Sequence, residues 1–230
     1  MNIVITGASR GIGYETVKTL SKLDGHCILA ISRNPDRLEK LRSETISSPS
    51  RVMIMAADIN EQYEAVRDTV SREMGRLDIL VNNAGMLVNK PFDRLENEDF
   101  DGMFNTNARA VFLLVRSLLE LFNDQSHIVN IGSMGGVQGS AKFPGLSLYS
   151  ASKGAISILT ECLAAELGPR GIRVNCLALG AAQTEMLEQA FPGYQAPLSA
   201  PEMAGFIANF ALTGQKFFNG KILPVALSTP

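Results

Sequence analysis

Short apolar runs alternate with amphipathic stretches along most of the 230-residue chain. The apolar runs have the length of β-strands, and the stretches between them repeat apolar residues every three or four positions, as helices with one buried face do. After the first run, for example, Val17, Leu20 and Leu23 are spaced for a single helix face. We expect strands at 2–5, 27–31, 51–57, 77–81, 127–131, 172–179 and 221–225, and helices after 13, at 36–43, up to 75, and at 98–122, 149–167 and 201–212. The alternation predicts one α/β domain, residues 1–230, with a parallel sheet covered by helices on both faces.

Glycine, asparagine and aspartate directly follow several of the predicted strands, at the edge where parallel sheets bind ligands. Gly7, Gly11 and Gly13 stand between the first strand and the first helix, where backbone N–H groups and a helix N-terminus can receive a phosphate. Their G-x-x-x-G-x-G spacing is neither the usual dinucleotide fingerprint nor a P-loop. A purely structural tight turn is the alternative, but the flanking strand and amphipathic helix favour a binding loop.

The end of the second strand indicates which nicotinamide cofactor the site prefers. An NAD site would place Asp or Glu there to accept from the ribose 2′-hydroxyl. This chain instead has Ser32 and Arg33, followed by Asn34, and Arg10 stands in the first turn. Two guanidinium groups complement a 2′-phosphate, which favours NADP(H) over NAD(H). The alternative is that Arg33 is a solvated loop residue.

Two longer segments carry residues of interest. The helical pattern at 98–122 contains Asn107, which either faces solvent or has a specific hydrogen-bonding task. Residues 134–148 form a glycine-rich loop, and residues 180–198 are irregular but too apolar for a linker. The second of these segments predicts a mobile cover over a pocket, or else a patch buried by a partner subunit.

Tyr149 and Lys153 stand four residues apart, just after the glycine-rich loop. On a helix they would share one face, about one turn apart. An unperturbed tyrosine has a pKa of roughly 10, and a nearby cation favours the phenolate, which moves the group toward the range of a general acid or base. The pair suits proton exchange with an alcohol or carbonyl oxygen. Taken alone, the spacing also fits an exposed helix that happens to carry both residues.

Composition narrows the class of protein. With 46% hydrophobic residues, 19% charged residues and a net charge of −2, nothing indicates nucleic acid or a membrane as partner. No apolar run could span a bilayer, and we expect no leader peptide before the first strand. Cys27, Cys162 and Cys176 lack metal-ligand spacing and predict reduced, buried thiols in a cytoplasmic protein without a metal site. His26 and His127 each precede an apolar run, so we expect them at strand entries.

Together these residues resemble the short-chain dehydrogenase/reductase family. The resemblance rests on TGASRGIG at 6–13, NNAG at 82–85, Asn107, Ser133, YSASK at 149–153 and RVN at 173–175. The motifs occur in the family's order and cover nearly the whole chain. The resemblance implies a Rossmann-like, doubly wound fold and a nicotinamide cofactor.

The resemblance also implies residue roles. Tyr149 would be the general acid in reduction and the base in oxidation, and Lys153 would lower the phenol pKa and hydrogen-bond the nicotinamide ribose. Ser133 would hold and polarise the substrate oxygen, and Asn107 would keep a water in a proton relay that ends at Lys153. Asp58 and Ile59 would meet the adenine and Thr184 the nicotinamide amide. The cofactor contacts implied in full are Gly7, Ser9, Arg10, Gly11, Ile12, Gly13, Arg33, Asn34, Asp58, Ile59, Asn83, Ala84, Gly85, Tyr149, Lys153, Gly180 and Thr184.

The sequence departs from the family pattern in three places. The interval between Ser133 and Tyr149 is longer than usual, which enlarges the substrate loop. Leu179 stands before Gly180 where the family usually has proline. The tail 223–230 lacks the glycine pair that usually follows the last strand, and in many relatives this tail builds subunit contacts. The resemblance implies a homodimer or homotetramer, and the altered tail bears on whether a tetramer forms.

These features predict an NADPH-dependent carbonyl reductase, or an alcohol dehydrogenase running in reverse, acting on a small molecule. Its pocket would lie between segments 134–148 and 180–198 and be lined by Met134, Phe143, Met186, Phe191 and Tyr194. The alternative is a non-catalytic redox sensor or scaffold that binds the nucleotide, although the presence of all four catalytic residue types speaks against it. The sequence leaves the substrate and the direction of reaction open.

Overall fold

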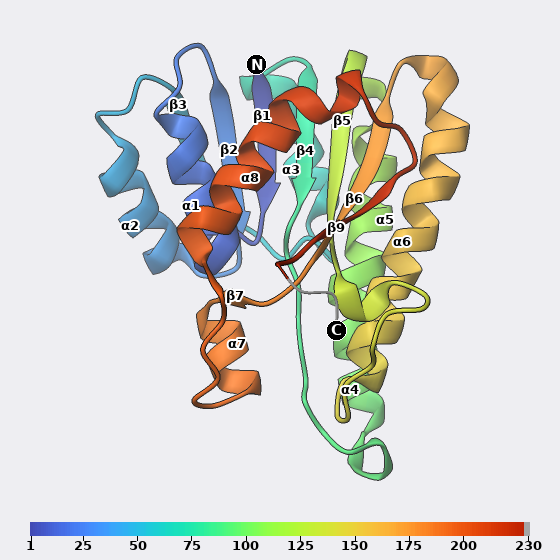
Figure 1. Ribbon diagram of the computed structural model, residues 1–230. Coiled ribbons are helices and arrows are strands. Elements are labelled where there is room, and N and C mark those ends of the chain that lie inside the picture. Colours follow the sequence, from blue (N-terminus) through green and yellow to red (C-terminus); the bar gives the residue numbers. More distant parts are fainter. Residues whose placement is uncertain (228–230) are drawn as a thin grey trace.

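A parallel β-sheet runs through the middle of the molecule, and helices cover both of its faces (Figure 1). The computed structural model describes residues 1–227, and over that range the sheet has seven strands in the order β3-β2-β1-β4-β5-β6-β9. The strands are β1 (Asn2–Thr6), β2 (Cys27–Ser32), β3 (Arg51–Ala56), β4 (Leu77–Asn82), β5 (Phe122–Ser133), β6 (Arg173–Leu179) and β9 (Ile222–Val225). All neighbouring pairs are parallel. The predicted doubly wound, Rossmann-like sheet is confirmed, and its strand order reverses between β1 and β4.

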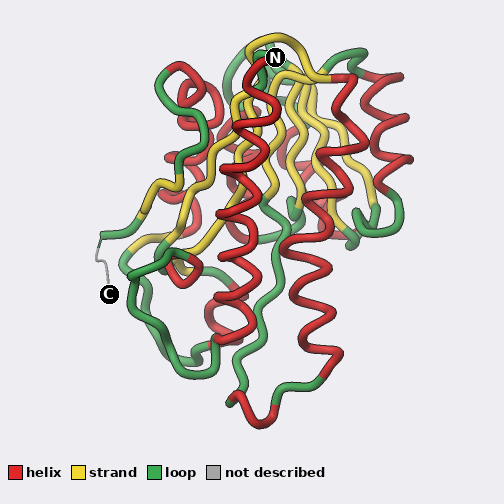
Figure 2. The backbone as a smooth tube through the Cα atoms, turned by 90° about the vertical axis from the view of Figure 1, so that its right-hand side faces the viewer, coloured by secondary structure: helices red, strands yellow, loops and turns green. Residues whose placement is uncertain are grey.

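Two helical layers enclose this sheet (Figure 2). One layer contains α1, α2 and α8, and its apolar residues form one core cluster with the strands. The other contains α3, α5 and α6, which share the second cluster. The helices are α1 (Gly11–Ser21), α2 (Pro35–Thr45), α3 (Tyr63–Glu73), α4 (Asn97–Phe104), α5 (Ala110–Leu118), α6 (Ser147–Leu167), α7 (Glu185–Ala190) and α8 (Ala200–Thr213). Single 3-10 turns occur at Phe92–Arg94, Leu119–Leu121, Met134–Gly136, Gly168–Arg170 and Gly214–Lys216.

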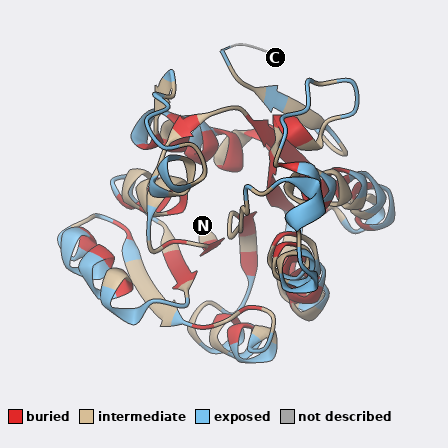
Figure 3. Cartoon of the chain, turned by 90° about the horizontal axis from the view of Figure 1, so that it is seen from below, coloured by how far each residue is buried: buried red, intermediate tan, exposed pale blue. Residues whose placement is uncertain are grey.

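The central strands are buried on both faces. Ile3, Val4 and Ile5 of β1 are fully buried, as are Ile28 and Ile31 of β2. Viewed from below, the central strands lie between helices whose outward faces are exposed (Figure 3). Strands covered on both faces are continuous apolar runs rather than alternating ones, which is why their positions could be predicted from the sequence.

The helix predicted at 98–122 is wrong in two respects. A π-helical turn, Asn105–Arg109, separates α4 from α5, and Phe122 already belongs to β5. A π turn adds a residue to the helical repeat and so shifts the apolar stripe. Phe100 and Phe112, which the threefold and fourfold spacing of apolar residues over 98–122 places on one buried stripe, are each 46% exposed. The early start of β5 was hidden because polar residues follow Phe122 and the ladder to β4 is irregular there.

Four further predictions need correction. Leu23, predicted on the buried face of the first helix, is 44% exposed because α1 ends at Ser21. Of the thiols predicted to be buried, Cys162 is exposed and Cys27 is half-buried. His26 does precede β2, but His127 lies inside β5.

Segment 180–198 contains regular structure rather than an irregular chain. Two short strands, β7 (Ala182–Gln183) and β8 (Leu198–Ser199), pair in parallel and join the ends of the segment. The helix α7 lies between them, below the carboxyl edge of the sheet in Figure 1. The end of the tail, residues 228–230, to which subunit contacts were assigned, lies outside the described residues. Within residues 1–227, every helix is too short or too polar to cross a membrane.

Candidate active site

A cavity of about 610 Å³ opens at the carboxyl edge of the sheet. It extends past the ends of β1, β2, β4, β5 and β6 and under α7. The predicted site residues that line it are Gly7, Ser9, Arg10, Gly11, Ile12, Arg33, Asp58, Ile59, Asn83, Ala84, Gly85, Ser133, Tyr149, Lys153, Gly180 and Thr184. Gly13, Asn34 and Asn107 lie outside the lining: Gly13 and Asn107 are buried, and Asn34 caps α2. The structure thus brings together groups that are far apart in sequence.

The glycine-rich loop is shaped for close backbone approach. Gly7 and Gly11 have φ values of 68° and 57°, a region that residues with a Cβ rarely adopt. Gly13 has no room for a side chain, because a Cβ there would overlap the Asn83 amide and the Gly7 carbonyl. Arg10, the residue before α1, makes no side-chain cap, so the first N–H groups of this helix have neither an intrahelical nor a capping partner. The loop therefore fits a phosphate group.

Thr6 ties the two central strand ends together. Its hydroxyl accepts hydrogen bonds from the backbone N–H groups of Asn83 and Ala84, each at 3.1 Å. The Asn83 side chain donates in return to the carbonyls of Thr6 at 3.0 Å and Gly7 at 3.2 Å. Thr6 was not predicted as a site residue, although its position at the end of a strand, before the first glycine, could have indicated it.

Tyr149, Lys153 and Ser133 meet at the deep end of the cavity. Tyr149 and Lys153 lie on α6, and Ser133 ends β5. The Lys153 ammonium donates to the carbonyl of Ile131 at 2.8 Å and lies 6.0 Å from the centre of the Tyr149 ring. This arrangement holds a hydroxyl, a phenol and an ammonium around one space, where a carbonyl or alcohol oxygen could be bound.

The pKa values of this cluster differ from the sequence expectation. Burial raises the pKa of the Tyr149 phenol, and its hydrogen bond with Ser133 opposes the rise. The net shift of the phenol pKa is therefore upward, opposite to the lowering expected from Lys153. Burial also lowers the pKa of Lys153 to about 8, because a buried ammonium loses hydration. At neutral pH the phenol is thus protonated and the amine remains largely charged.

Asn107 has a specific hydrogen-bonding role and does not face solvent. It is 1% exposed and lies in the π-helical turn. Its amide oxygen accepts from the N–H of Met86 at 2.8 Å, and its amide nitrogen donates to the carbonyl of Met86 and to the Ser152 hydroxyl, both at 2.9 Å. A Cβ at Gly85 would lie 3.4 Å from the Asn107 amide oxygen and 3.5 Å from the Lys153 nitrogen. The side chain therefore fixes the chain beside the Lys153 ammonium.

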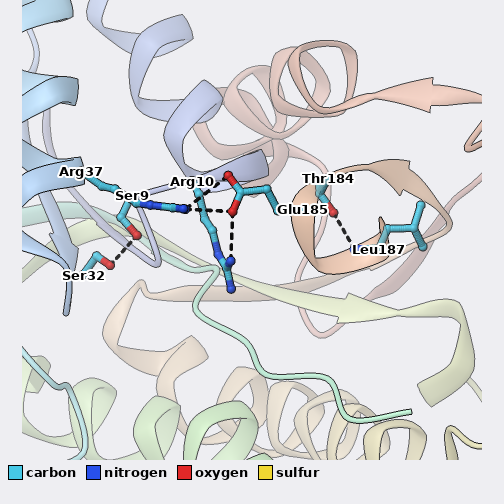
Figure 4. A network of polar contacts seen from close by, with 7 residues as sticks. All are labelled: Ser9, Arg10, Ser32, Arg37, Thr184, Glu185 and Leu187. Carbon is cyan, nitrogen blue, oxygen red and sulfur yellow. Dashed lines mark hydrogen bonds and ion pairs between the residues drawn. The ribbon is translucent and has the colours of Figure 1, made fainter. Parts of the chain in front are cut away.

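The far end of the cavity is rich in charge (Figure 4). Arg10 and Arg37 both donate to the carboxylate of Glu185 on α7, with shortest distances of 3.1 and 2.9 Å. The predicted Arg33 is more open, since its side chain is 76% exposed and 3.9 Å from the Asp58 carboxylate. Arg37 and Glu185 were not predicted as site residues. Arg37 could have been found from its position, because it follows the α2 cap by three residues and so lies on the first turn.

The opposite side of the cavity is apolar. Met134, Phe143, Met186, Phe191 and Tyr194 all line it, as predicted for the substrate side, together with Leu87, Leu146 and Leu187. The ladder between β7 and β8 holds this cover at its base. Among the described residues, no group of His, Cys, Asp and Glu is arranged to hold a metal ion.

The geometry agrees with comparisons to known proteins. A family model described as short chain dehydrogenase matches residues 1–195. The chain is 35% identical to gluconate 5-dehydrogenase of Gluconobacter oxydans over 191 residues, 81% of this chain and 73% of that protein. It is 36% identical to carbonyl reductase [NADPH] 2 of Sus scrofa over 179 residues, 76% of this chain and 69% of that protein. A crystal structure of a short chain dehydrogenase from Burkholderia cenocepacia in complex with NADP superposes with a TM-score of 0.87 at 29% identity, covering 97% of this chain and 95% of that one.

Proposed function

The chain belongs to the short-chain dehydrogenase family, whose members oxidise alcohols or reduce carbonyls, and from that premise we propose an NADPH-dependent oxidoreductase in which Tyr149 is the general acid and base. The observation that carries this proposal is the shared cavity. Tyr149, Lys153 and Ser133 line its deep end, and the glycine-rich loop lines the same space. Proton-transfer groups and a phosphate-binding loop on one cavity are what hydride transfer with a dinucleotide requires.

The residues would divide the chemistry as follows. When bound, the nicotinamide supplies or accepts a hydride. The Ser133 hydroxyl would hold the substrate oxygen, and Tyr149 would donate a proton to it in reduction or remove one in oxidation. The raised pKa of Tyr149 keeps the phenol protonated near neutral pH, which suits an acid in reduction. Lys153 would stabilise the phenolate left behind, and Asn107, with Met86, would hold the relay that returns a proton to Lys153.

The preference for NADPH follows from the charge at the far end of the cavity. Arg10, Arg33 and Arg37 gather around the end of β2, where Ser32 takes the place of an acidic residue. The Ser32 hydroxyl donates to that of Ser9 at 2.7 Å, so β2 itself ends in a hydroxyl and not in the carboxylate that an NAD site places at this strand end. Guanidinium groups complement a 2′-phosphate through charge-assisted hydrogen bonds.

The remaining cofactor contacts extend the same proposal along the cavity. Asp58 and Ile59 would meet the adenine, and residues 83–85 would form the far wall. Gly180 and Thr184 would lie by the nicotinamide, although Thr184 also caps α7 by accepting from the N–H of Leu187 at 3.2 Å. The apolar lining supports a small alcohol or carbonyl substrate with an apolar body.

Location and assembly belong to the same proposal. We expect a cytoplasmic protein, where the exposed thiol of Cys162 would stay reduced. A homodimer or homotetramer would cover the exposed Phe100, Phe112 and Ile158 of α4, α5 and α6, which are 46%, 46% and 61% exposed. Light scattering coupled to gel filtration measures the assembly directly.

Titration with NADPH and NADH, followed by nicotinamide fluorescence, tests the cofactor assignment. We expect tighter binding of NADPH, and loss of that preference in Arg33→Ala and Arg37→Ala. Tyr149→Phe should bind NADPH with nearly unchanged affinity while losing turnover against a panel of carbonyl compounds. Wild-type turnover in this variant would exclude Tyr149 as the acid, and failure to bind either dinucleotide would favour a protein that is not an enzyme.

A further inference from the structure

Helix α7 is held over the cavity by polar contacts and by the half-buried side chains of Met186 and Leu187. None of its residues, Glu185–Ala190, is fully buried. One end is fixed by the β7–β8 ladder, and the other by the Asn89 amide, which donates to the carbonyl of Ala190 at 2.8 Å. The first turn is held by Glu185, whose carboxylate accepts hydrogen bonds from the guanidinium groups of Arg10 and Arg37 (Figure 4). The position of this cover is therefore governed by charge at its N-terminal end.

The two arginines come from separate elements. Arg10 and Glu185 line the cavity, and Arg37 lies beside it through its ion pair with Glu185. Arg10 is the residue before α1, and Arg37 lies on the first turn of α2, beyond the strand that ends at Ser32. The contacts to Glu185 use the Nη1 atom of each guanidinium, at 3.1 Å for Arg10 and at 2.9 and 3.3 Å for Arg37. A 2′-phosphate placed between Ser32 and these arginines would require the same donors.

We propose that Glu185 is a specificity-determining residue that competes with the 2′-phosphate of NADPH for Arg10 and Arg37, and that it keeps α7 docked while no 2′-phosphate is bound. The proposal rests on the proposed function, because it assumes that the ribose end of the cofactor lies at these arginines. Its consequence is that the cover over the substrate side responds to which dinucleotide is present.

The exchange of partners is physically favourable. The side chains of Arg10, Arg37 and Glu185 are 42%, 43% and 51% exposed, so solvent screens both ion pairs and each is worth little. A phosphate monoester carries about −1.5 to −2 charges at neutral pH, against one for the carboxylate. The guanidinium groups thus gain by transferring from Glu185 to the phosphate. NADH has an uncharged hydroxyl at this position, which does not compete with the Glu185 carboxylate for the guanidinium groups.

Release of Glu185 would also loosen the helix start at the glycine-rich loop. Thr184, the cap of α7, lies against Gly11: a Cβ on that glycine would be 3.4 Å from the Thr184 methyl carbon. Because no residue of α7 is fully buried, loss of the carboxylate contacts leaves this end held, among the described residues, by the cap, the adjacent ladder and the half-buried Met186 and Leu187. Backbone amides of 185–190 should then exchange with solvent more readily.

Glu185→Gln removes the competing charge while keeping the shape of the side chain. We expect it to tighten NADPH and adenosine 2′,5′-bisphosphate by about threefold to tenfold, the range set by two exposed ion pairs. Affinity for NADH and AMP should change less than about twofold by the same reasoning, since neither ligand contacts the freed arginines. Glu188→Gln is the matched control, because Glu188 lies on the same helix and its carboxylate accepts from the N–H of Gly193, at 3.1 Å, instead of from an arginine. Isothermal titration calorimetry measures all four ligands.

Hydrogen exchange of the wild-type protein gives a second readout that needs no variant. Amides of 185–190 should be protected in the free protein and with NADH, and exchange faster with NADPH or adenosine 2′,5′-bisphosphate. Unchanged or weaker binding of the bisphosphate by Glu185→Gln would overturn the inference, as would equal tightening of AMP. A wild-type preference for NADH would refute the proposed cofactor preference, whereas the bisphosphate comparison between the two variants still decides whether Glu185 competes.

Discussion

Folding stability should fall as the pH drops, because His127 is buried in its neutral form. The ring is fully buried inside β5. Its Nδ1 lies 3.0 Å from the carbonyl of Ala211, so this nitrogen carries the proton and donates. Nε2 lies 3.1 Å from the amide nitrogen of Asn175 and accepts from it. That amide cannot turn, since its nitrogen also donates to the carbonyl of Phe218 and its oxygen accepts from the N–H of Lys221. A second proton on the ring, at Nε2, would therefore point at the N–H donor of the Asn175 amide.

The size of the effect follows from the pKa. Burial lowers the pKa of His127 from 6.5 to about 4. Because the unfolded chain binds the proton more readily, stability is fully present above pH 6.5 and is lost as the pH falls toward 4. A difference of this size corresponds to about 3 kcal/mol in total, and about 2 kcal/mol of that is lost by about pH 5.

Urea unfolding between about pH 8 and pH 5 measures this loss. Using a His26→Gln background makes His127 the only histidine that titrates, and His127→Gln in that background is the comparison. We expect the free energy of unfolding of the background protein to fall about 2 kcal/mol more than that of the double variant across this range. Parallel pH dependences in the two proteins would refute the reasoning, because carboxylates contribute equally to both.

Three further outcomes follow from the site. Gly13→Ala should destabilise the protein by about 1–3 kcal/mol and abolish dinucleotide binding, because the new Cβ overlaps the Asn83 amide. The control is Gly205→Ala on α8, where nothing lies within 4 Å of the new methyl group. This variant should have a thermal stability equal to or higher than that of the wild type. Asn107→Leu should cost about 1–3 kcal/mol in urea unfolding and lower kcat, because two backbone partners at Met86 lose their hydrogen bonds; unchanged kcat would argue against its positioning role. The kcat/KM for reduction should fall above pH 8, where Lys153 loses its charge; a profile that stays flat well beyond that pH would show that the ammonium is not needed.

The strands, and the edge of the sheet that carries the site, could be predicted because they depend on residues that are close together in the sequence. Doubly buried strands are continuous apolar runs, and the glycines that follow β1 record a backbone conformation that residues with a Cβ avoid. The four-residue interval between Tyr149 and Lys153 fixes their relation on α6 whatever surrounds it. Such features depend on neighbours in the sequence, and the sequence alone determined them.

Contacts between distant segments were decided only by the tertiary structure. Arg37 and Glu185 are 148 positions apart, and no periodicity relates them. The setting of Asn107 depends on the π-helical turn and on Met86, and the exposure of Phe112 depends on the same turn. The phenol pKa depends on how deeply Tyr149 is buried. Local spacing sets which side chains share a face, whereas burial and charge pairing depend on which faces meet when the whole chain packs.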